Sequence, residues 1–190
     1  LLPGVALDPA AMIDLRRQLA AGASLVAILG ALGLRAPTSS LVPWSRWITP
    51  RLASVTRKRF DTRFFVARAP ADQDALHDNH EATEAVWHTP REALLRYWDG
   101  QIELAPPQIM SLSQLARFAT VDAVLSAARA VAPALIEPEP HDHEGVRVIC
   151  YPGDERHSQR QPLWDGPTRL VHRNGRFEPL GGLAELLPVA

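Results

Sequence analysis

Strand-like and helix-like segments alternate along the chain from residue 41 onward, and this alternation restricts it to a mixed α/β fold. In 59–67, every second residue from Phe60 to Val66 falls on one face, as expected for a strand whose side chains alternate between two faces. The segment Thr89-Pro90-Arg91-Glu92 then carries the signature of a helix N-terminus. Thr89 is the cap, Pro90 takes the first helical position and Glu92 closes a capping box.

The same reasoning predicts the remaining elements. We expect helices, strands and a closing hairpin whose primed turn is Asn174-Gly175. The helices are predicted at 8–22, 24–33, 89–100 and 111–131, and the strands at 41–49, 59–67, 82–88, 146–151, 168–172 and 176–180. The predicted organisation is one domain over 1–136 with a helical insertion at 1–35, and a C-terminal β extension over 137–190 packed on the same domain.

Charge and hydropathy exclude two classes of partner. The 190 residues contain 20 basic and 21 acidic side chains, a net charge of −1, which lacks the basic excess of a nucleic-acid-binding protein. The apolar stretch Leu25–Leu34 spans ten residues, whereas a membrane-spanning helix needs about 20. We therefore expect a protein that binds neither nucleic acid nor membrane. The single cysteine, Cys150, cannot form an internal disulfide, so we expect a cytoplasmic location.

Two polar clusters contain residue types that can bind a metal ion. His141-Asp142-His143-Glu144 offers possible ligands, but contiguous ligands rarely converge on one ion, and we expect a solvated loop. Asp72, Asp74 and Asp78 lack the glycine and the terminal glutamate of a calcium loop. A metal hydrolase that uses His141 and His143 is therefore a weak alternative.

Two further features are candidates for binding a phosphorylated ligand and a divalent cation, respectively. Five cations lie within 13 positions and could bind phosphate, although a solvated loop explains them on spacing alone: Arg51, Arg57, Lys58, Arg59 and Arg63. Glu81 and Glu84 lie beside an acidic loop, as carboxylates that bind a hard cation such as Mg²⁺ often do. From the residues alone, an ordinary surface position is the favoured interpretation of these two glutamates.

Several short strings lie in a distinctive order along the chain: Pro43-Trp44-Ser45-Arg46-Trp47-Ile48-Thr49-Pro50, Arg59-Phe60-Asp61-Thr62-Arg63-Phe64-Phe65, Glu81, Trp87, Thr89-Pro90, Glu92-Ala93-Leu94, Pro106-Pro107 and Pro152-Gly153-Asp154. In this order they resemble a Nudix hydrolase, in the branch that contains the peroxisomal acyl-coenzyme A diphosphatase.

The sequence departs from the Nudix pattern in one place. The Nudix box ends in Arg-Glu, an aliphatic residue, any residue and Glu-Glu, whereas Arg91-Glu92-Ala93 is followed by Leu94, Leu95 and Arg96. We therefore expect the chain to be the C-terminal portion of a Nudix enzyme that begins just after its box.

The resemblance implies an α/β/α Nudix sandwich that is incomplete at the N-terminus, without its early strands and box helix. It implies hydrolysis of a pyrophosphate linkage by water activated by Mg²⁺ (or Mn²⁺), and a small-molecule substrate: coenzyme A, an acyl-CoA or another nucleoside diphosphate derivative. Glu81 would be the catalytic base or a metal ligand, and Arg46, Arg59 and Arg63 would bind substrate. The alternative is a Nudix-like binding module without a box and without catalysis. No feature indicates the oligomeric state.

Overall fold

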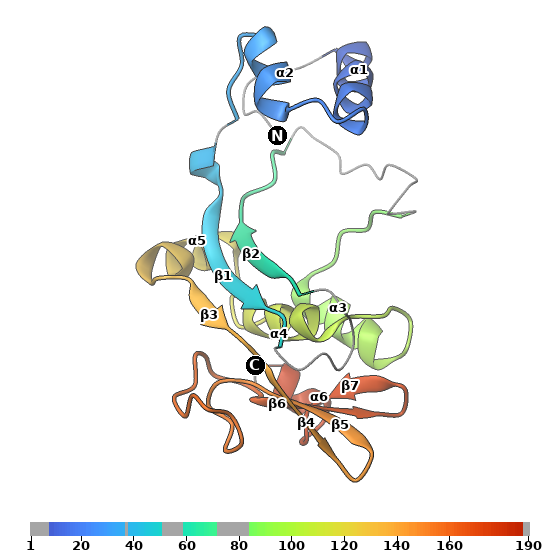
Figure 1. The fold of residues 1–190 in the computed structure, drawn as a ribbon, viewed down its shortest axis with the longest axis vertical. Helices are drawn as coiled ribbons and strands as arrows, with labels where there is room; N and C mark the ends of the chain where they lie inside the picture. The colour runs from blue at the N-terminus through green and yellow to red at the C-terminus, as the bar shows by residue number, and fades with distance from the viewer. Residues whose placement is uncertain (1–7, 37, 51–58, 72–83, 188–190) are drawn as a thin grey trace. The chain divides into compact units, whose positions relative to one another are not determined.

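The computed structural model describes residues 8–36, 38–50, 59–71 and 84–187 (Figure 1). The chain forms two compact units, one from Leu1–Leu41 and Ala67–Asp74 and the other from Val42–Val66 and Ala75–Ala190. No helix among the described residues combines the length and the apolar character that crossing a membrane requires.

The first unit contains the two helices expected from their caps. Helix α1 (Pro9–Ala20) begins after Asp8, whose carboxylate accepts a hydrogen bond from the Ala10 N–H at 3.2 Å. Helix α2 (Leu25–Ala31) follows and buries Ile28 and Leu29. A single turn of 3-10 helix, η1 (Thr38–Ser40), leads to the second unit. The helical prediction for this part of the chain is confirmed.

A three-stranded sheet begins the second unit. Strands β1 (Val42–Ile48) and β2 (Asp61–Val66) pair antiparallel, and β3 (Ala134–Ile136) adds to the other edge of β1 in parallel, which gives the order β2-β1-β3. Helix α5 (Val121–Ala130) packs Leu125 and Ala128 against Val42, and it lies along β1 in Figure 1.

The C-terminal strands form a second, antiparallel sheet. Its order is β4 (Glu139–His143), β5 (Val146–Cys150), β6 (Arg169–Arg173) and β7 (Arg176–Glu178). The predicted primed turn between β6 and β7 is confirmed, because Asn174 and Gly175 both have positive φ, 51° and 76°. The loop predicted at 141–144 is wrong: residues 141–143 belong to β4 and pair with β5, so hairpin pairing overrides the polar composition.

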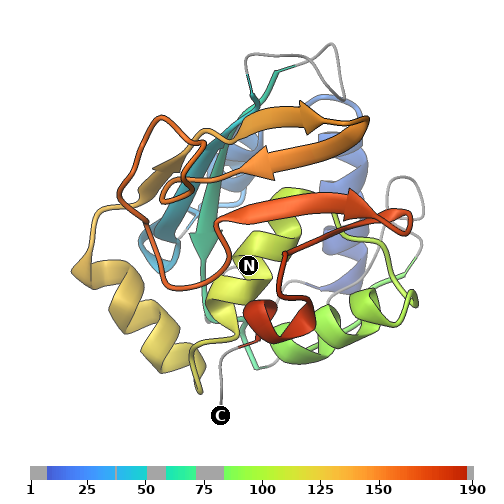
Figure 2. The ribbon, with the colours of Figure 1, turned by 90° about the horizontal axis from the view of Figure 1, so that it is seen from below.

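Three helices share one hydrophobic core with both sheets: α3 (Pro90–Trp98), α4 (Pro106–Leu115) and the short α6 (Leu183–Leu186). Figure 2 shows these helices gathered beside the strands. The core side chains are almost fully buried and come from both sheets and all three helices: Trp47, Leu94, Tyr97, Ile109, Met110, Ile136, Ile149, Tyr151, Leu170 and Leu186.

The capping box that opens α3 is confirmed, since Thr89 Oγ1 accepts from the Glu92 N–H at 3.1 Å and Glu92 accepts from the Thr89 N–H at 2.9 Å. Two other predictions are wrong. Residues 84–88 form neither strand nor helix. The helical stretch predicted at 111–131 consists of two helices, α4 and α5 (Val121–Ala130), and α4 ends at Leu115. Helix α4 begins before Ser111, at Pro106, because prolines start it and the side chain of Gln108 accepts from the Ala105 N–H at 2.7 Å.

Candidate functional site: a basic face on the three-stranded sheet

Two of the predicted substrate-binding arginines lie side by side on the three-stranded sheet. Arg46 on β1 is directly opposite Arg63 on β2 and directly opposite Leu135 on β3. Directly paired residues point to the same side of a sheet, so these three side chains form a row across it. Their neighbours Trp47 and Ile136 point to the other side, into the core. We call this row, together with Asp61, Arg59 and Glu137, the basic face.

Asp61 holds the guanidinium of Arg46 in place. The Arg46 Nε donates to Asp61 Oδ1 at 2.7 Å, and Nη2 lies 2.5 Å from Oδ2. The hydrogen bond to Asp61 raises the pKa of Arg46, and the hydrogen bond from Arg46 lowers the pKa of Asp61. Both side chains are about two-fifths exposed, 41% and 43%, so the pair adds little stability. Its effect is to fix the direction of a planar guanidinium, a group whose geometry matches that of phosphate oxygens.

Arg59 crosses the end of the same sheet. It stands two residues before Asp61, so strand alternation puts it on the same side as Asp61 and Arg63. Its Nε donates to the Thr49 carbonyl at 3.2 Å, and its Nη2 lies 3.4 Å from Glu137 Oε1. Thr49 and Glu137 follow the adjacent ends of two parallel strands, so Arg59 spans from β1 to β3. The structure thus brings all three predicted arginines onto one face.

Other predicted site residues lie outside the described part of the chain: Glu81, Arg51, Arg57, Lys58, Asp72, Asp74 and Asp78. Glu84 is described and is exposed in a segment without regular structure. Because 84–88 form no strand, strand alternation does not relate the direction of Glu84 to that of Glu81.

A cavity of about 560 Å³ adjoins the basic face. Leu135 and Glu137 lie at its β3 side, Glu139 and His141 come from β4, and His157 and Ser158 come from the loop between β5 and β6. Sequence reasoning missed this cavity, because its walls come from segments about 20 residues apart that meet only through the pairing of β4 with β5. No local signal marked it.

Hydrogen bonds fix the cavity wall. The Ser158 hydroxyl and N–H both donate to the Glu139 carboxylate. Burial acts to raise the pKa of Glu139, but these bonds, with His157 and His141 nearby, lower it overall. His157 is tied at both ring nitrogens, with Nε2 3.0 Å from the Glu137 carbonyl and Nδ1 accepting from the Gln159 N–H at 2.9 Å.

These histidines do not complete a metal site. His141 Nε2 lies 4.0 Å from Glu139 Oε2, and His157 Nε2 lies 3.9 Å from Oε1. Within the described ranges, no group of three or more histidine, cysteine, aspartate or glutamate side chains could hold a metal ion. The side chain of His143 is not among those described.

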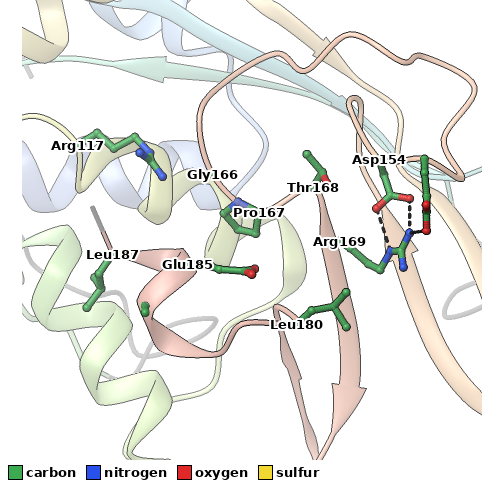
Figure 3. Close-up of a pocket in the computed structure, with 11 residues that line it drawn as sticks. Arg117, Asp154, Gly166, Pro167, Thr168, Arg169, Leu180, Glu185 and Leu187 are labelled. Atoms are coloured by element: carbon green, nitrogen blue, oxygen red, sulfur yellow. Dashed lines mark hydrogen bonds and ion pairs between the residues drawn. The ribbon is translucent and has the colours of Figure 1, made fainter. Parts of the chain in front are cut away.

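A second cavity, of about 660 Å³, lies between the end of α4, the start of β6 and α6 (Figure 3). On one side, Arg169 Nε and Nη2 donate to the two Asp154 oxygens at 2.9 and 2.8 Å. On the other side, Arg117 points toward Gly166 and Pro167 in Figure 3. Asp154 and Arg169 anchor the loop that carries His157 and Ser158, because the Arg156 N–H also donates to Asp154 at 2.8 Å.

Comparisons with known proteins agree on one family. A family model described as the NUDT19 Nudix domain matches residues 4–115. The chain is 40% identical over 150 residues to the acyl-coenzyme A diphosphatase NUDT19 of Xenopus laevis, an alignment that covers 74% of this chain and 38% of that protein. It is 37% identical over 78 residues to the human protein of the same name, covering 41% of this chain and 20% of that protein. A Caenorhabditis elegans protein named putative nudix hydrolase 7 is 27% identical over 160 residues, covering 77% of this chain and 53% of that protein.

The chain thus spans less than two fifths of the length of its Xenopus relative. No solved structure matches it significantly. We expected the chain to lack the Nudix box, and this expectation is not supported, because the family model already matches from residue 4. The Glu-Glu pair of the box is nevertheless absent from the 190 residues. The mixed α/β architecture is consistent with a Nudix-type fold, as expected. On the family match over residues 4–115, the chain belongs to the NUDT19 Nudix-domain family of hydrolases.

Proposed function

We propose that this chain belongs to a Nudix diphosphatase that cleaves the pyrophosphate linkage of coenzyme A or an acyl-CoA. The chain binds this substrate through the basic face. The observation that carries the proposal is the row formed by Arg63 and Arg46, with Arg59 at the end of the same sheet face. Guanidinium groups bind phosphate oxygens in a planar, two-pronged geometry, and two adjacent phosphates need more than one such group. The names of the relatives support a substrate of the CoA type.

The three arginines differ in how firmly they are held. Arg46 is fixed by Asp61 and Arg59 by Thr49 and Glu137, whereas the exposed Arg63 has no hydrogen bond or ion pair to another described residue. Arg63 is therefore the arginine whose full donor set is available to a phosphate. Its neighbour Arg46 would set the direction from which that phosphate approaches.

Nudix hydrolases generally use a divalent metal, which lowers the pKa of the attacking water and stabilises charge on the phosphates. Among the described residues, no group of three or more histidine, cysteine, aspartate and glutamate side chains could hold such an ion. We assign Glu81 the role of base or metal ligand, and Mg²⁺ or Mn²⁺ that of the ion, on the family resemblance. Because the sequence contains no consecutive glutamate pair, we also propose that the 190 residues alone do not hydrolyse CoA.

Calorimetric titration of the purified chain with CoA tests the binding proposal. Arg63→Ala should weaken binding roughly tenfold or more, since a hydrogen bond to a charged group contributes about 1.5–3 kcal/mol and 1.4 kcal/mol is tenfold. Arg129→Ala removes an equally charged, exposed arginine from α5 and should leave affinity unchanged. If Arg63→Ala binds CoA as tightly as Arg129→Ala does, the role of the basic face is refuted.

In parallel, release of adenosine 3′,5′-bisphosphate from CoA should be measured with the chain and Mg²⁺. Turnover by the 190 residues would contradict the proposal that hydrolysis needs further glutamates. In a catalytically competent form, Arg63→Ala should raise KM more than it lowers kcat, because a phosphate contact made equally in ground and transition states affects binding alone.

A further inference from the structure

The cavity of about 560 Å³ beside β3 begins where the row of arginines ends. Leu135 is the third member of the row Arg63-Arg46-Leu135, and it also lines the cavity. Glu137, which binds Arg59, lines the cavity as well. A ligand whose phosphates lie over the arginines therefore has a direct path into this cavity, whose size suits an organic group of moderate length.

The chemistry of the walls selects what enters. Pro138, Pro140 and Leu135 provide apolar contact, while Glu139 and Ser158 provide hydrogen-bonding oxygens. Both carboxylates of the cavity already have partners, Glu137 in Arg59 and Glu139 in Ser158, and the imidazoles of His141 and His157 line it as well. The described lining therefore offers apolar contact and hydrogen-bonding groups, but no arginine or lysine that would bind a further phosphate.

Coenzyme A extends from its diphosphate in two directions that differ in charge. The adenosine side carries a 3′-phosphate, whereas the pantetheine side is uncharged and carries two amides, a hydroxyl group and a dimethyl-substituted carbon. Only the pantetheine side combines hydrogen-bond donors with apolar groups and no additional negative charge. On the basis of the proposed function, we propose that this cavity is the subsite for the pantetheine arm of the substrate, with the diphosphate over the arginines and the nucleotide outside.

The test compares two ligands and a pair of matched variants. Ser158 is exposed and lines the cavity, so Ser158→Trp should fill it without disturbing the core. Ser126→Trp makes the same change at an exposed serine of α5 and is the control. By calorimetry on the purified chain, Ser158→Trp should weaken CoA at least tenfold and leave adenosine 3′,5′-bisphosphate within twofold, while Ser126→Trp should affect neither.

Three results would overturn the assignment. Unchanged CoA affinity in Ser158→Trp would show that the cavity is not used, and selective loss of adenosine 3′,5′-bisphosphate would place the nucleotide there instead. The third result, no CoA binding by the unaltered chain, would refute the proposed function too. If the first result is found while Arg63→Ala still weakens CoA binding, only this subsite is refuted. Gln159→Trp, at another exposed lining residue, provides the same comparison if Ser158→Trp does not fold.

Discussion

Replacing Asp154 by Asn should destabilise the protein strongly, because it breaks a nearly buried ion pair on one side only. Both Asp154 oxygens accept from Arg169, at 2.8 and 2.9 Å, and Oδ1 also accepts from the Arg156 N–H. The side chains of Asp154 and Arg169 are only 5% and 16% exposed. Asparagine keeps the shape but leaves the guanidinium with only the exposed carboxylate of Glu155 as a charge partner.

The size of the effect follows from that burial. Removing one partner of a buried pair typically costs about 3–5 kcal/mol, and the open cavity beside Arg169 favours the lower end, about 3 kcal/mol. Glu155 supplies a matched control on the same arginine, since it accepts from Arg169 Nη2 at 3.0 Å but its side chain is 78% exposed. Glu155→Gln should therefore cost less than about 1 kcal/mol.

Urea unfolding at pH 7 measures both variants against the unaltered chain, provided the transition is two-state. A second series at low pH tests the charge directly. Burial acts to raise the pKa of Asp154, but the hydrogen bonds from Arg169 and Arg156 lower this pKa overall. The stability that the charged Asp154 contributes is therefore fully present above pH 3.8, the ordinary pKa of the group, and is lost as the pH falls below that value. The difference in the free energy of unfolding between Asp154→Asn and the unaltered chain should become smaller over that pH range. Equal costs for the two variants at pH 7, or a gap that widens in acid, would refute the reasoning.

Three other outcomes are expected. Gly153→Ala should destabilise by several kcal/mol in urea, since φ is +98° and the new Cβ would lie 2.7 Å from Pro162 Cβ; Gly175→Ala, in open space at φ +76°, should cost less. Tyr97→Phe should cost about 1–3 kcal/mol, because the buried hydroxyl donates to the Phe177 carbonyl at 2.7 Å and accepts from the Phe177 N–H at 2.9 Å, and its loss leaves both unpaired; a change near zero would mean that water replaces them. In a catalytically competent form, Glu81→Gln should lower kcat by about 10²–10⁴-fold, as loss of a general base does. Glu84→Gln, at an exposed position, should leave kcat unchanged. If both variants keep nearly the kcat of the unaltered enzyme, Glu81 is a surface residue and not part of the site.

The sequence alone determined the features that depend on residues a few positions apart. The capping box of α3 needs only Thr89, Pro90 and Glu92, and the primed turn needs only Asn174 and Gly175. Alternation within β2 was enough to put Arg63 and Asp61 on one side. These predictions succeeded because a helix turn and a strand repeat are set by neighbours in the chain.

Tertiary pairing decided the rest. The position of Leu135 beside Arg46 requires β3 to pair in parallel with a strand about 90 residues earlier, and no local pattern encodes which strand it chooses. In the same way, 141–143 became a strand because Val146–Val148 offers a hairpin partner, although its own residues are polar. The cavity beside the basic face exists only because that hairpin brings Glu139 to Ser158. Hydrogen bonds between distant strands outweigh the weak preferences of single residues, so the wall of the proposed subsite could be found only in the folded chain.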